Sequence, residues 1–100
     1  MALMKNYDFD NLKNEAEIFV TEELERQLET ASESVCHCND CVLDMAAVAL
    51  NTVKPLYRVS LLGTLYAAQA MDEKNYASSV RDAVLRAIAK VQKNPSHDIS

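Results

Sequence analysis

The chain has 100 residues, 49% of them hydrophobic, which is enough for one compact domain with a single modest core. Its formal net charge of −5 excludes a broad basic surface for DNA or RNA, so we expect no direct DNA binding, although ten Lys and Arg residues can still form a pocket for a small anion. With one glycine and two prolines, the sequence lacks the turn residues that all-β folds need, and it favours an all-α domain.

Residues 1–10 show no hydrophobic period and are predicted to form a flexible arm. From residue 11 onward, apolar residues recur at every fourth position, which predicts an amphipathic helix over residues 11–31. The opposite side of this helix is acidic, and we interpret it as a solvated helix face. Its carboxylates are Glu15, Glu22, Glu25 and Glu29.

Three cysteines follow this helix within six residues, at Cys36, Cys38 and Cys41. Thiolates at this spacing suit a tetrahedral zinc site, which needs a fourth ligand. His97 is a better fourth ligand from this chain than His37, and a second subunit or water could also supply one. The alternative is three reduced thiols packed under a helix start, or a redox pair. The absence of other cysteines indicates a reduced, cytoplasmic protein rather than a disulfide framework.

A second helix is predicted over residues 40–51, with Asn39 or Asp40 as its N-cap and Asn51 as its C-terminal stop. It is apolar on nearly all sides, which places it in the core or in an oligomer interface. Asp44 is the exception, because a buried carboxylate needs a partner. It can pair with Arg58, cap a neighbouring backbone, or orient a metal ligand.

Pro55 disfavours a helical conformation at the residue before it, so Asn51–Val59 is predicted to be an extended crossing segment. It carries an amide, two cations and an aromatic ring, and Arg and Tyr together can clamp a phosphate and a base. The alternative is an ordinary crossing loop with Tyr57 packed on the core. The residues concerned are Asn51, Lys54, Tyr57 and Arg58.

Residues 60–71 and 73–93 are predicted to form two further helices, with Asp72 as the N-cap of the last, followed by a polar tail over 95–100. The prediction is therefore a small, compact domain of four to five helices over residues 11–94, with a cysteine-rich knuckle. We see no catalytic arrangement of side chains and no Gly-rich phosphate loop, and we expect no enzymatic activity. No signal peptide is visible, and the longest apolar stretch is about half a membrane span, so we expect a soluble protein.

Three sequence pieces, in order, resemble the ComFB family. They are Glu22-Glu23-Leu24-Glu25, then Cys36-x-Cys38-x-x-Cys41-x-x-Asp44, then Ala47-x-Ala49-Leu50-Asn51-x-x-x-Pro55-x-Tyr57. The resemblance runs from Glu15 to Val91, about three quarters of the chain. It implies a small helical domain that forms a symmetric homodimer, with zinc at the cysteine cluster. Some relatives have a further cysteine where this chain has Pro95-Ser96-His97, which leaves His97 as a replacement ligand.

The resemblance also implies a role connected with DNA-uptake competence and the binding of a cyclic dinucleotide, c-di-GMP or c-di-AMP. It assigns Asn51, Lys54, Tyr57 and Arg58 to this ligand near the dimer axis, with Tyr66 as a weaker candidate for stacking on a base. The dimer interface is predicted to include residues such as Met45, Val48 or Leu62. As a signalling protein, the chain would act on an unidentified effector that regulates competence, pili or motility. The alternative is a zinc-stapled accessory protein of the DNA-uptake machinery that binds no nucleotide.

Overall fold

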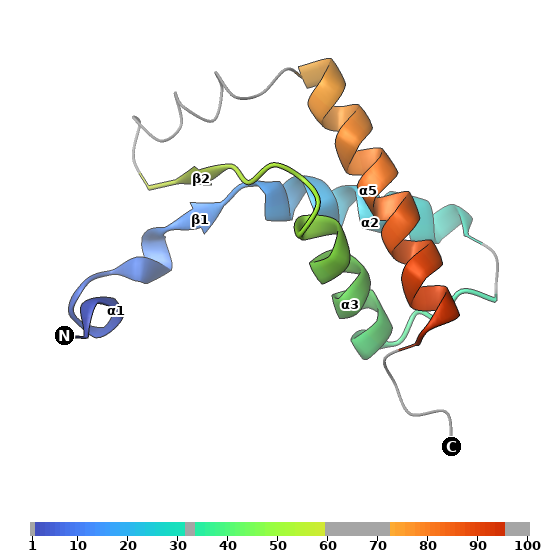
Figure 1. Ribbon diagram of the computed structural model, residues 1–100, viewed down its shortest axis with the longest axis horizontal. Helices are drawn as coiled ribbons and strands as arrows, with labels where there is room; N and C mark the ends of the chain where they lie inside the picture. The colour runs from blue at the N-terminus through green and yellow to red at the C-terminus, as the bar shows by residue number, and fades with distance from the viewer. Residues whose placement is uncertain (1, 32–33, 60–72, 96–100) are drawn as a thin grey trace.

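The structure, a computed structural model, describes residues 2–31, 34–59 and 73–95 (Figure 1). Their elements are α1 (Leu3–Asn6), a 3-10 helix η1 (Phe9–Asn11), β1 (Lys13–Asn14), α2 (Ala16–Thr30), α3 (Asn39–Leu50), β2 (Tyr57–Arg58) and α5 (Glu73–Lys93). In these parts of the chain the strands form only a two-stranded antiparallel sheet. The predicted all-α class is therefore confirmed.

Helices α2, α3 and α5 pack together around one hydrophobic core (Figure 1). Each contributes one apolar face, because buried residues recur at helical spacing along it. The central members are Ala16, Val20 and Leu24 of α2, Cys41, Met45 and Ala49 of α3, and Val80, Ala83, Val84, Ala87, Ile88 and Val91 of α5. The apolar row predicted for the first helix thus faces the core from Ala16 onward.

The first long helix begins at Ala16 and not at residue 11, so that predicted start is wrong. The preceding residues are committed to the sheet, in which Lys13 lies opposite Arg58 and Asn14 opposite Tyr57. The Asn14 side chain holds this junction together. Its Oδ1 accepts one hydrogen bond from the Ala16 N–H at 3.1 Å and another from the Leu56 N–H at 2.7 Å.

We therefore expect Asn14→Ala to lower the free energy of unfolding by about 2–4 kcal/mol, because two buried N–H groups lose their acceptor. Ala16 is 0% and Leu56 2% exposed, so water does not readily replace the lost oxygen. Urea unfolding measures the effect. Asn11→Ala, at an exposed position in η1, is the matched control. Equal unfolding midpoints for the two variants would show that the Asn14 junction contributes no stability.

Helix α3 starts one residue before the predicted position, and its N-cap is Cys38 rather than Asn39 or Asp40. The Cys38 Sγ accepts a hydrogen bond from the Cys41 N–H at 3.4 Å, which satisfies one of the unpaired donors of the first turn. The C-terminal stop at Asn51 is confirmed. The next two residues turn back onto Ala49, so the crossing segment is extended only in its later part.

Helix α5 spans Glu73–Lys93, which confirms the last predicted helix. The helix predicted over 60–71, with Asp72 as the following cap, lies outside the described residues. The predicted arm contains α1 and begins η1, and neither element buries a residue. None of the helices in the described ranges combines the length and hydropathy that a transmembrane span requires.

Candidate functional site

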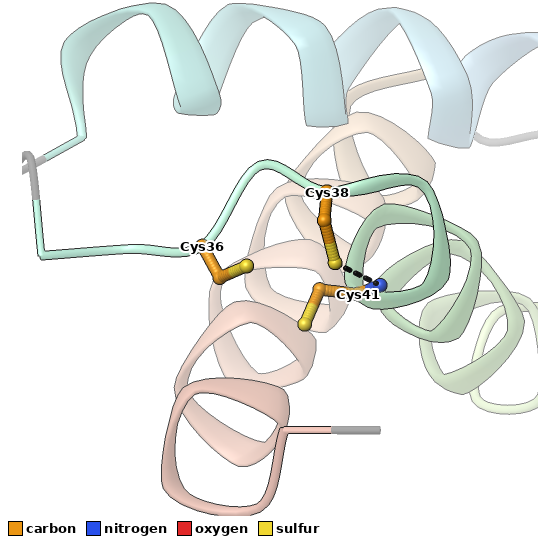
Figure 2. Close-up of side chains that lie close together, drawn as sticks. All are labelled: Cys36, Cys38 and Cys41. Atoms are coloured by element: carbon orange, nitrogen blue, oxygen red, sulfur yellow. Dashed lines mark hydrogen bonds between the residues drawn. The ribbon is translucent and has the colours of Figure 1, made fainter. Parts of the chain in front are cut away.

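The three cysteines converge at the start of α3. Cys36 and Cys38 come from the turn after α2, and Cys41 comes from the first turn of α3. Their sulfur atoms all lie within 4.8 Å of one another, none is in a disulfide, and Figure 2 shows them turned toward one another. Cys41 is buried and the other two are partly buried. The turn thus delivers three soft ligands to one point on the edge of the core.

This donor set fits zinc. A tetrahedral zinc ion with bonds of about 2.3 Å holds its sulfurs about 3.8 Å apart, so small rotations of these side chains suffice. Within the described ranges, no further His, Cys, Asp or Glu joins the three cysteines. His37 instead lines a groove between α2 and α3, which is consistent with the prediction that His37 is not the fourth zinc ligand. His97 lies outside the described residues.

Asp44 does not hold Arg58. Arg58 donates its Nε–H to Glu15 Oε1, at the start of α2. Asp44 itself is only partly buried, so its carboxylate keeps access to water and is not the costly buried charge that the apolar helix suggested. The predicted Asp44–Arg58 pair is therefore wrong.

The segment that follows α3 presents its polar side chains to solvent. Asn51, Lys54, Tyr57 and Arg58 are all exposed, Tyr57 by 56%. Tyr57 therefore does not pack in the core of the chain, contrary to the ordinary-loop interpretation. Tyr66, the fifth predicted ligand residue, lies outside the described residues.

Two buried residues of this segment and a hydrogen bond from α5 hold its backbone in place. Val53 is 6% and Leu56 2% exposed, and the Tyr76 hydroxyl of α5 donates a hydrogen bond to the Lys54 carbonyl oxygen at 2.9 Å. Partial burial raises the pKa of the Tyr76 phenol, so it remains a donor at neutral pH. The backbone of the segment is thus fixed to α5 and to α2, while its side chains face outward.

Several cavities open between the described elements. One of about 290 Å³ lies between α2 and α5 beside the edge-to-face pair Phe19–Tyr76, and one of about 480 Å³ lies between α2 and α3. Two further hollows, of about 290 and 380 Å³, lie beside the N-terminal arm and between the C-terminal half of α2 and α5. None of these four is lined by Asn51, Lys54, Tyr57 or Arg58, so those residues form an exposed surface patch rather than a pocket.

The three residues predicted for a dimer interface differ in their burial and in whether the structure describes them. Met45 is 0% exposed in the core of the single chain, so its assignment to an interface is wrong. Val48 is partly buried, and Leu62 lies outside the described residues. Leu43 of α3 is a large apolar residue that is exposed, by 60%.

Two contacts at the segment were missed from the sequence. The sequence predicts Glu15 on a solvated acidic helix face, and the predicted helix over residues 11–31 includes Asn14. An asparagine two residues before an apolar stripe is a recognisable start signal, so Asn14 could have been found. No local signal joins Glu15 to Arg58, because they are 43 residues apart.

Comparison with known proteins places this geometry in context. The family model described as "Late competence development protein ComFB" matches residues 13–95, which include the cysteine cluster and the Asn51–Arg58 segment. The solved structure of the late competence protein ComFB from Bacillus subtilis is 27% identical, with a TM-score of 0.67, covering 85% of this chain and 92% of that one. Comparison with curated proteins finds no match.

Proposed function

The chain belongs to the ComFB family, and from that premise we propose that it is a cytoplasmic, non-enzymatic receptor for a cyclic dinucleotide, c-di-GMP or c-di-AMP. The observation that carries the proposal is the outward presentation of Lys54, Tyr57 and Arg58 on a short segment with a fixed backbone. Two cations and an aromatic ring are the groups that phosphates and purines require. Binding would alter the contact with an effector protein.

The ligand chemistry assigns a role to each side chain. Arg58 and Lys54 meet phosphate oxygens, and the guanidinium can also read a purine edge. Tyr57 stacks on a base, a contact worth about 1–3 kcal/mol in single-stranded nucleic-acid binding. Asn51 offers an amide to a base edge, and Tyr66 remains a further stacking candidate.

A homodimer supplies what a single chain lacks at this site. The four side chains lie on an exposed surface, so a second wall has to come from elsewhere. A cyclic dinucleotide carries two phosphates and two purines, and a two-fold dimer can meet both halves with equivalent residues. We therefore place the ligand across the dimer axis, with Val48 and Leu62 as interface residues.

Zinc has a structural role in this proposal. Cys36, Cys38 and Cys41 would hold it, with His97 as the fourth ligand, and the ion would tie the turn before α3 to the start of that helix. The site is separate from the segment that binds the nucleotide. Zinc loss is therefore expected to affect stability first.

We expect Arg58→Ala to weaken nucleotide binding at least about tenfold, or about 1.4 kcal/mol, while the melting temperature stays nearly unchanged. The small thermal effect follows because an exposed ion pair contributes little stability. Calorimetric titration with c-di-GMP and with c-di-AMP measures the affinity. Arg86→Ala, an exposed arginine on α5, is the control and should bind as the wild type does.

A second variant sharpens this test. Glu15→Gln removes the anion that occupies Arg58, so it should leave nucleotide binding intact or tighten it. A large loss of stability in Arg58→Ala, with binding preserved in the folded fraction, would make Arg58 a structural residue. Failure of the wild type to bind either nucleotide would reject the receptor.

The Glu15–Arg58 ion pair favours one other function. Arg58 already has an anionic partner in the free chain. In this second function the segment binds no ligand, and its role is to hold β2 against the start of α2. The chain would then be a zinc-stapled accessory protein of the DNA-uptake machinery. The same titrations separate the two functions.

A further inference from the structure

A groove of about 480 Å³ runs between α2 and α3, away from the Asn51–Arg58 segment. Its walls are mostly apolar and come from both helices. Leu24 and Leu28 lie on the α2 side, and Val42, Leu43 and Ala46 lie on the α3 side. Leu43 is 60% exposed, so within the described part of the chain this apolar surface is open to solvent.

The carboxylates along the rim of the groove make it acidic. Glu25 and Glu29 line it from α2 and are both exposed, and among the described residues that line it there is no Lys or Arg. The hollow on the other side of α2 differs, because Arg26 and Arg81 line it. The apolar floor and the acidic rim thus occur together on the α2–α3 face.

We propose that this groove binds a basic amphipathic helix of a partner protein. Two packed helices with apolar residues at i and i+4 form the kind of trough into which a third helix lays its apolar face. Aliphatic anchors of that helix would fill the space beside Leu28 and Leu43. Its Lys or Arg residues would lie over Glu25 and Glu29, whose charge would repel an acidic helix or an anionic lipid surface.

This proposal does not depend on nucleotide binding. None of Asn51, Lys54, Tyr57 and Arg58 lines the groove, so the two surfaces can be altered separately. The dimer proposed above uses Val48, which does not line the groove either.

The test uses two helical peptides of about 15 residues, long enough to be helical once bound. Both carry Leu at i, i+3, i+4 and i+7, and they differ in having either Lys or Glu at the remaining positions. By fluorescence anisotropy with the full chain, the Lys peptide should bind at least about tenfold more tightly than the Glu peptide, given charge complementarity across the rim. Reversing the rim with Glu25→Lys and Glu29→Lys together should invert this preference.

Leu43→Asp should weaken binding of the Lys peptide at least about tenfold, because it puts a charge on the apolar floor. Leu85→Asp is the matched control, since Leu85 is 61% exposed on α5 and does not line the groove. Equal losses in both variants, or equal affinity for both peptides, would overturn the proposal. Light scattering adds one more decisive result: a wild-type dimer that Leu43→Asp converts to monomer would make the groove a contact between two copies of this chain instead.

Discussion

Removal of zinc by a chelator is expected to lower the melting temperature of the purified protein by at least about 10 °C, equivalent to about 2 kcal/mol in a domain of this size. Zinc held by the three cysteines would tie the turn after α2 to the first turn of α3, where Cys41 is buried in the core, so its loss would free a junction between two core helices. Elemental analysis should find about one zinc per chain before chelation.

Cys38 allows the metal to be separated from the helix cap. Cys38→Ser removes a thiolate but keeps a side chain that caps helices well, whereas Cys38→Ala removes both functions. Both variants should lose zinc and become insensitive to the chelator, and the Ser variant should be more stable than the Ala variant by about 1 kcal/mol. A wild type without zinc and without a response to the chelator would leave three reduced thiols packed at a helix start.

Met45→Ala is expected to lower the free energy of unfolding by about 2–5 kcal/mol, the usual loss for a buried methionine whose cavity does not collapse. Met45 is 0% exposed and is the largest of the fully buried side chains in the described ranges. Val48→Ala, at a partly buried position on the same helix, should cost clearly less and serves as the control.

Protein concentration distinguishes the core from an interface. Destabilisation by Met45→Ala should be the same at low and high protein concentration, because Met45 packs within one chain. If the loss grew on dilution, Met45 would be contributing to association between subunits instead.

The main helices could be predicted because their signals are local. An apolar residue at every fourth position of α2 and of α5 is the face that packs in the core. The cysteine cluster is local as well, since all three cysteines fall within six residues around one helix start. Short spacings of this kind leave few arrangements of the backbone.

The errors came from contacts between distant parts of the chain. The start of α2 depends on pairing between Asn14 and Tyr57, and the partner of Arg58 is Glu15, which only the folded arrangement brings near. The phase of α3 was ambiguous for another reason. A helix that is apolar on nearly every side does not reveal which side is buried. The sequence therefore offers Met45 as an interface residue, although Met45 lies in the core and Leu43 is exposed.

The tripeptide Cys36-His37-Cys38 serves two surfaces at once. The cysteines face the sulfur cluster, and the histidine between them lines the α2–α3 groove. The conformation of these three consecutive residues therefore contributes to both the cysteine cluster and the groove, and zinc binding and helix binding would share this one structural element. If zinc changes the affinity of the groove for a helix by some factor, the helix must change the affinity for zinc by the same factor. Zinc availability would then be an input to the protein in its own right, and titrating zinc with and without the Lys peptide measures the coupling.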